Sequence, residues 1–282
     1  MACIIDGKAL SGKIKKNLRV DIKELKERNV FPGLAVVLAG DDPASKIYVS
    51  NKEKACQELG IHSKVYRLNS DTNQAEVMNL IEKLNNDSKI HGILVQLPLP
   101  GHIVEKEVIE AIDPKKDVDC FHPENVGRML SGNGRMFPCT PAGVMEMLKE
   151  YEIEIVGKDA VVIGKSNIVG KPMAAMLLNA GATVTVCHSR TKDLKAHCEK
   201  ADILVSAAGK AGLITADMIK SGAAVIDVGI NRSEDGKIIG DVDFEKVKDV
   251  AGAITPVPGG VGPMTIAMLV KNTILATKIL SL

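Results

Sequence analysis

The sequence has few aromatic side chains and no tryptophan. Aromatic residues occupy 2% of its 282 positions, and the formal net charge is only +1, from 36 basic and 35 acidic residues. Proteins that bind single-stranded nucleic acid combine a basic groove with aromatic side chains on which the bases stack. The composition offers neither feature, so we expect no nucleic-acid partner.

Metal-binding patterns are also missing. The six cysteines form no CxxC pair, and they share no metal-ligand spacing with the six histidines. We therefore predict no metal site. Most of the cysteines are interpreted as small core side chains of a protein in a reducing compartment.

The N-terminus lacks a long apolar stretch. The first residues, MACIIDGKALSGKIKKNL, have no signal-peptide core and continue into an amphipathic helical pattern. We expect a cytoplasmic enzyme with no membrane segment. The chain is 45% hydrophobic, and its length allows two domains, each with its own core.

The sequence does contain an alternation of apolar runs and helical patterns. Short apolar runs, typical of strands buried on both faces, occur at 34–39, 92–95, 160–163, 183–187, 203–206, 224–228 and 253–255. Helical patterns lie between most of them, and the last helix is predicted from 263 to about 280. The alternation predicts an α/β protein with parallel sheets, and the second series has the order of a doubly wound nucleotide-binding domain. Residues 114–141 are rich in Gly, Pro, Asn and Asp, which predicts a long functional loop that crosses between domains.

One helical pattern, residues 45–60, places a lysine among apolar residues. At the helical period, Lys52 lies on the same face as Tyr48, Ala55 and Cys56. An ammonium group held against an apolar surface is desolvated, which favours the neutral, proton-accepting amine. Lys52 is therefore a candidate catalytic residue, although a lysine at such a position can also extend along its neighbours to reach water.

A glycine-containing turn is the candidate phosphate site. Residues 164–172, GKSNIVGKP, follow a predicted strand and open a helix, so their backbone amides can receive a phosphate. A turn without a ligand is the alternative. The next strand ends near Ser189 and Arg190, where NAD-binding domains usually carry an acid for the ribose hydroxyl. Together with Lys165 these residues favour NADP over NAD, and the alternative for Arg190 is a solvated basic turn.

Polar residues and a Gly/Pro-rich loop stand where ligands collect in α/β proteins. Gln96 follows the carboxyl end of its strand, where its amide can hydrogen-bond Lys52. Asp119 lies in the long loop and can accept a hydrogen bond from a polar heterocycle. Either can also be a structural turn or edge residue. Residues 256–265, PVPGGVGPMT, can bring backbone close to a ligand, or can tether the last helix.

Five motifs together resemble the bifunctional methylenetetrahydrofolate dehydrogenase/cyclohydrolase family, known by the bacterial name FolD. They are YVSNKEKACQELGI, GILVQLPLP, PKKDVDCFHPENVGR, GKSNIVGKPM and ITPVPGGVGPMT, in this order over nearly the whole chain. The resemblance implies NADP-linked oxidation of 5,10-methylenetetrahydrofolate to the methenyl form, followed by hydrolysis to 10-formyltetrahydrofolate. It also implies a homodimer joined through the nucleotide domains.

The resemblance implies a role for individual residues. Lys52 would be the catalytic lysine, Tyr48 would pack beside the folate, Gln96 would tune the lysine and Asp119 would bind the pterin ring. Substrate contacts are expected at Tyr48, Val95, Gln96, Leu97, Asp119, Pro258, Gly259 and Gly262. Cofactor contacts are expected at Gly164, Lys165, Ser166, Ser189, Arg190 and Ile230.

The implied architecture is two α/β domains with a cleft between them. Residues 1–138, completed by the C-terminal helix 264–282, would form the catalytic folate-binding domain. Residues 139–263 would form a Rossmann-like NADP-binding domain.

Two positions depart from the pattern of the family. Lys165 stands where relatives typically have Arg, which keeps the charge but loses the bidentate fork for a phosphate. Cys120 stands where relatives typically have Gly, so a side chain lies beside Asp119 at a position that favours a glycine conformation.

The sequence leaves two other functions to consider, an enzyme of narrower activity and a protein that only binds a nucleotide. A monofunctional NAD-linked dehydrogenase on the same scaffold would differ in its cofactor rates and product. A nucleotide-binding module without catalysis is disfavoured, because a mere binder needs no buried amine.

Overall fold

The computed structural model describes residues 2–233 and 235–281. Its chain forms two compact units, each assembled from separate segments. The six-strand unit contains the residues up to Gly12, Met129–Asn133 and Thr140–Thr265. The three-strand unit contains Lys13–Arg128, Gly134–Cys139 and the residues from Ile266 onward.

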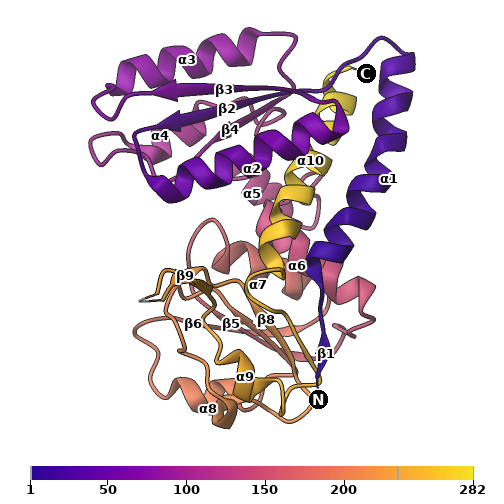
Figure 1. Ribbon diagram of the computed structural model, residues 1–282, viewed down its shortest axis with the longest axis vertical. Coiled ribbons are helices and arrows are strands. Elements are labelled where there is room, and N and C mark those ends of the chain that lie inside the picture. The colour runs from indigo at the N-terminus through magenta and orange to yellow at the C-terminus, as the bar shows by residue number, and fades with distance from the viewer. Residues whose placement is uncertain (1, 234, 282) are drawn as a thin grey trace. The chain divides into compact units, whose positions relative to one another are not determined.

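The three-strand unit is a small parallel sheet covered by helices. Its elements are most of α1 (Gly7–Glu27), β2 (Gly33–Ala39), α2 (Pro43–Leu59), β3 (His62–Leu68), α3 (Gln74–Asn86), β4 (Gly92–Val95), α4 (Glu105–Glu110), most of α5 (Pro123–Leu130) and most of α10 (Val261–Leu280). The strand order is β3-β2-β4, and both pairs are parallel. Figure 1 shows α2 on one side of this sheet and α3 on the other.

Local sequence signals explain where α2 begins and ends. The Asp42 side chain accepts a 2.7 Å hydrogen bond from the Ser45 backbone N–H, and Pro43 occupies the first turn. Gly60 ends the helix with a left-handed φ of 68°. The buried face contains Val49, Lys52, Ala55, Cys56 and Leu59, so the helix turns its one buried lysine toward the interior.

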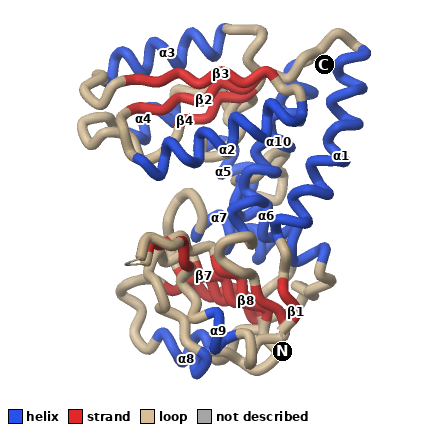
Figure 2. The backbone as a smooth tube through the Cα atoms, in the orientation of Figure 1, coloured by secondary structure: helices blue, strands red, loops and turns tan. Residues whose placement is uncertain are grey.

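The six-strand unit is a doubly wound sheet. Its elements are β1 (Cys3–Ile4), most of α6 (Cys139–Glu150), β5 (Asp159–Ile163), α7 (Gly170–Asn179), β6 (Thr183–Cys187), α8 (Leu194–Cys198), β7 (Ile203–Ser206), the 3-10 helix η1 (Ala216–Met218), β8 (Ala224–Asp227), the short pair β9 (Asn231–Arg232) and β10 (Ile238–Ile239), α9 (Phe244–Val247) and β11 (Ala253–Ile254). The strand order is β1-β11-β8-β7-β5-β6, and its neighbours are parallel. Figure 2 shows β7, β8 and β1 as parts of one sheet.

The strand order reverses at β5. The next strand in sequence, β6, lies on one side of β5, and the following strand, β7, lies on its other side. The crevice outside the carboxyl ends of strands at such a reversal is where doubly wound proteins bind ligands. The loops after β5 and β7 are therefore the expected ligand-binding loops of this unit.

Most of the predicted elements are present, and the differences have local causes. All seven predicted strands occur, with ends that differ by one residue at most. The predicted long loop at 114–141 instead contains the helix α5, whose Pro123 is compatible with a first helical position. Strand β3 was not predicted, because its exposed, lysine- and arginine-containing sequence lacks a continuous apolar run. Within the described residues, every helix is too short or too polar to cross a membrane.

Candidate active site

Lys52 is the centre of a polar cluster in the three-strand unit. Its side chain leaves the buried face of α2, and the residue is only 8% exposed. The ammonium nitrogen Nζ donates a 3.0 Å hydrogen bond to Gln96 Oε1. The contact predicted between these two residues is thus present, and Lys52 does not extend outward into water.

Gln96 is held in one orientation by its own neighbour. It follows the last residue of β4, and its Nε2 donates a 2.8 Å hydrogen bond to the carbonyl oxygen of Leu97. Because the amide nitrogen is occupied, the amide oxygen faces Lys52. The Val95 side chain packs in the core beneath α3, and Leu97 packs against the same core, so both support the position of Gln96.

Asp119 lies within the electrostatic reach of Lys52. Burial raises the pKa of the Asp119 carboxyl, while the positive charge of Lys52 acts in the opposite direction. The Cys139 thiol is 2% exposed and lies 3.6 Å from Asp119 Oδ1 and 3.4 Å from the Val118 carbonyl oxygen. Cys139 was not singled out from the sequence, where a cysteine before Thr-Pro carries no signal of this contact.

The loop that carries Asp119 is fixed by the last helix. Asn272, on α10, donates from Nδ2 to the Val118 carbonyl oxygen at 2.8 Å and to the Phe137 carbonyl oxygen at 2.9 Å. Next to Asp119, Cys120 is 1% exposed and has a φ of 59°. Cys120 therefore adopts a left-handed conformation that favours glycine.

Tyr48 lies one helical turn before Lys52 on α2 and is partly buried. The residue placements therefore bring Lys52, Gln96 and Asp119 together. Tyr48 shares the helix that presents the lysine.

The predicted phosphate turn follows β5 in the six-strand unit. Gly164 has a φ of 120°, and a Cβ atom added there would lie 2.3 Å from the carbonyl oxygen of Ala207, after β7. A Cβ atom added to Gly170 would lie 2.1 Å from the Gly164 carbonyl oxygen. Only glycine fits at both positions, and the resulting close turn lies at the strand reversal, where a dinucleotide would bind.

Neighbouring side chains shape this turn. Ser166 Oγ accepts hydrogen bonds from the backbone N–H groups of Val169 at 3.2 Å and Gly170 at 3.3 Å, so these two amides are already occupied. The amide of Gly164 donates to the carbonyl oxygen of Cys187, which joins the turn to the end of β6. Lys165 is exposed, as are Ser189 and Arg190 after β6 and Ile230 after β8.

The loop before α10 is anchored at the start of α1. The backbone N–H of Lys8 donates a 2.8 Å hydrogen bond to the Gly259 carbonyl oxygen. A Cβ atom on Gly7 would lie 1.9 Å from the Gly260 carbonyl oxygen. Pro258 is exposed, while Gly262 belongs to the first turn of α10. The loop that leads into α10 is thus tied to the start of α1.

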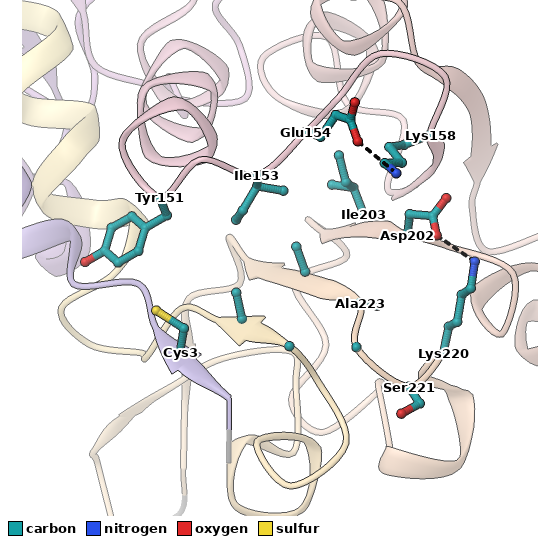
Figure 3. Close-up of a pocket in the computed structure, with 14 residues that line it drawn as sticks. Cys3, Tyr151, Ile153, Glu154, Lys158, Asp202, Ile203, Lys220, Ser221 and Ala223 are labelled. Carbon is teal, nitrogen blue, oxygen red and sulfur yellow. Dashed lines mark hydrogen bonds and ion pairs between the residues drawn. The ribbon is translucent and has the colours of Figure 1, made fainter.

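A pocket of about 420 Å³ lies at the other end of the six-strand sheet (Figure 3). Its lining includes Ile203 and Ala224, the first residues of β7 and β8. Lys158 and Glu154 pair at 3.0 Å, and Lys220 and Asp202 pair at 2.6 Å. Because dinucleotides bind at the carboxyl ends of such strands, this pocket at the amino ends is not the predicted cofactor site.

Comparison with known families decides the class of protein. Residues 5–119 match the tetrahydrofolate dehydrogenase/cyclohydrolase catalytic domain, and residues 138–280 match the tetrahydrofolate dehydrogenase/cyclohydrolase NAD(P)-binding domain. The chain belongs to the tetrahydrofolate dehydrogenase/cyclohydrolase family. The family and the enzyme class predicted from sequence are confirmed.

Individual members of the tetrahydrofolate dehydrogenase/cyclohydrolase family are similar over nearly their whole length. The bifunctional protein FolD of Acetivibrio thermocellus is 59% identical over 99% of this chain and 98% of its own. The crystal structure of the bifunctional enzyme FolD from Campylobacter jejuni is 56% identical, with a TM-score of 0.97 and 99% of each chain covered. The Trypanosoma brucei FolD structure, complexed with NADP cofactor and inhibitor, is 40% identical, with a TM-score of 0.95, and 99% of this chain and 98% of that chain are covered.

Proposed function

We propose that this protein oxidises 5,10-methylenetetrahydrofolate with NADP and hydrolyses the methenyl product to 10-formyltetrahydrofolate. The observation that carries the proposal is the buried Lys52, hydrogen-bonded to Gln96, in a chain that matches both domains of the family. The three-strand unit would serve the folate chemistry, and the six-strand unit would bind the dinucleotide.

The glycine turn fits a dinucleotide. Gly164 and Gly170 leave a space that any Cβ atom would fill, at the place where the strand order reverses. Gly164, Lys165, Ser166, Ser189, Arg190 and Ile230 are proposed to hold the cofactor. A dinucleotide held by these residues would supply the acceptor for the hydride that leaves the methylene carbon. The protein contributes mainly by aligning the two reacting carbons.

Hydrolysis requires proton handling, which we assign to Lys52. A water molecule adds to the methenyl carbon, a carbon–nitrogen bond then breaks, and one proton is released overall. The Lys52 amine is placed to take a proton from the attacking water, and Gln96 holds that amine in position. Asp119 is proposed to bind the pterin ring and Tyr48 to pack beside it. Val95, Leu97, Pro258, Gly259 and Gly262 are proposed to complete the substrate contacts.

A single assay tests this function. Methenyltetrahydrofolate formation and decay are followed in the same reaction, once with NADP and once with NAD. We expect NADP to support faster formation and the methenyl signal to decay into 10-formyltetrahydrofolate. Accumulation of the methenyl product without enzymatic decay, at a rate favoured by NAD, would instead support a monofunctional dehydrogenase.

We also propose that the protein is a cytoplasmic homodimer. Within the described residues, β6 has a hydrogen-bonded neighbour on one side only, and Val186 on this strand is 40% exposed. Leu178 on the preceding helix α7 is 57% exposed. An edge strand with apolar neighbours is a ready surface for a second copy. Light scattering is expected to give twice the mass of one chain, and a monomer mass would contradict the proposal.

A further inference from the structure

The buried carboxylate of Asp241 holds the loop that follows β7 by accepting hydrogen bonds from it. Asp241 is 0% exposed. Its Oδ2 accepts hydrogen bonds from Ser206 Oγ at 3.0 Å, Ala208 N at 2.8 Å and Gly209 N at 3.2 Å, and its Oδ1 accepts from Lys210 N at 2.9 Å and Asn231 Nδ2 at 3.0 Å. Such convergence of donors satisfies a buried charge and fixes the backbone that supplies them.

The loop that Asp241 holds forms one side of the predicted dinucleotide turn. Ala207 lies between Ser206 and Ala208, and its carbonyl oxygen is the atom that excludes a Cβ atom at Gly164. The position of this carbonyl therefore determines the space at the glycine turn. Because Asp241 binds the residues on both sides of Ala207, it controls that position.

Asp241 is itself held from the sheet. Asp227, the last residue of β8, accepts a 3.0 Å hydrogen bond from the Asp241 backbone N–H and a 2.9 Å hydrogen bond from that of Val242. A Cβ atom on Gly240 would lie 1.8 Å from Asp227 Oδ2, so the chain passes directly over this carboxylate. The loop after β7 is thus linked through two carboxylates to a central strand.

We propose that Asp241 is a positioning residue for the pyridine dinucleotide. It acts through the 207–210 loop and does not contact the ligand, because its oxygens are occupied by five donors and a bare negative charge would repel a phosphate. The inference rests on the proposed binding of NADP in this unit. Loss of the Asp241 carboxylate should weaken the affinity for the dinucleotide and leave the folate chemistry of the three-strand unit intact.

The substitution Asp241→Asn tests the proposal. Whichever way the carboxamide points, its NH₂ group meets donors that previously faced an acceptor. We expect the Kd for NADP, measured by calorimetry, to rise about tenfold. The dehydrogenase KM for NADP should rise in parallel, with kcat at saturating NADP within about threefold of wild type. Cyclohydrolase turnover of methenyltetrahydrofolate without dinucleotide should be unchanged.

Two further variants make the outcome decisive. Asp243→Asn removes a carboxylate two residues away, which pairs with Lys246 at the surface, and should leave the Kd unchanged. Asn231→Ala removes one donor to Asp241 and should raise the Kd about threefold, even if Asp241→Asn does not fold. Wild-type affinity in Asp241→Asn or in Asn231→Ala would overturn the positioning role. Wild-type protein that does not bind NADP would overturn the proposed function instead.

Discussion

Lys52 Nζ and Gln96 Oε1 lie 3.0 Å apart, and Gln96 Nε2 donates a hydrogen bond to the carbonyl oxygen of Leu97. The amide therefore cannot turn its NH₂ group toward the lysine without losing a hydrogen bond. An amide oxygen accepts a hydrogen bond from a charged or a neutral amine, so it holds Lys52 in place during proton transfer.

Replacement of the lysine should separate hydrolysis from cofactor binding. Lys52→Met keeps the length and apolar packing of the side chain but removes the amine, so we expect cyclohydrolase turnover to fall by at least about a hundredfold. The Kd for NADP should stay within about twofold. Lys54→Met, at an exposed position of the same helix, is the matched control and should retain activity. Hydrolysis by Lys52→Met at the wild-type rate would remove Lys52 from the mechanism.

A charge in place of the Gln96 amide should slow hydrolysis. In Gln96→Glu a carboxylate replaces the neutral oxygen that lies 3.0 Å from Lys52 Nζ, and it would pair with the ammonium form, which cannot accept a proton. Cyclohydrolase turnover should therefore fall by about tenfold or more. Gln57→Glu, on the exposed face of α2, should leave turnover unchanged. Wild-type turnover in Gln96→Glu would show that the contact does not matter for hydrolysis.

At Cys120 a glycine variant should be more stable than an alanine variant, the reverse of the usual order. At a φ of 59° a non-glycine residue costs roughly 1–2 kcal/mol, while glycine costs about 0.5–1 kcal/mol in chain entropy. Cys120→Gly should therefore be more stable than Cys120→Ala, by up to about 1 kcal/mol, in denaturant unfolding. Cys139, the first residue of helix α6, should show the opposite order. An alanine variant that is the more stable of the pair at Cys120 would show that the backbone there is not strained.

Asp227 should make stability fall as the pH rises. Burial raises the pKa of its carboxyl to about 6 from 3.8, with Asp241 acting in the same direction and backbone N–H groups opposing. The folded state thus favours the protonated form, so the favourable contribution is complete below about pH 4 and is lost as the pH passes 6. Relative to Asp227→Asn, the unfolding free energy of wild type should fall by on the order of 3 kcal/mol between pH 4 and 7.

An exposed aspartate provides the control for this pH dependence. The ion pair with Lys195 lowers the pKa of Asp217 to about 2, so its contribution is lost only as the pH falls below about 4. Asp217→Asn should therefore leave unchanged the slope of the unfolding free energy against pH between pH 4 and 7. If the unfolding free energies of wild type and Asp227→Asn changed equally between pH 4 and 7, Asp227 would not titrate in this range.

The elements that the sequence predicted are those with one strong local signal. The continuous apolar runs of β2 and β5 and the capped helix around Lys52 needed no knowledge of their neighbours. Strand β3 is exposed on alternate residues and contains charged side chains, so its place beside β2 depends on pairing that the sequence does not display. Helix α5 is short and stands among turn-forming residues.

The same distinction applies to the site. The sequence identified Lys52 as a candidate because a charged residue on an apolar helix face conflicts with its surroundings. Asp241 and Cys139 were not identified, because each conflicts with nothing nearby in the sequence. Their partners lie 10 to 35 residues away for Asp241 and 20 or 21 for Cys139, and only the fold reveals them.

The segmented composition of the two units constrains how such a protein can be recombined. Strand β1, from the first few residues, is the edge strand beside β11, and Met129–Asn133 also belongs to the six-strand unit. A continuous piece such as 140–265 would therefore leave one edge of its sheet without its partner strand. Neither unit can be exchanged with that of a relative by a single crossover, so a chimera that replaces the nucleotide portion has to inherit its first twelve residues from the same parent.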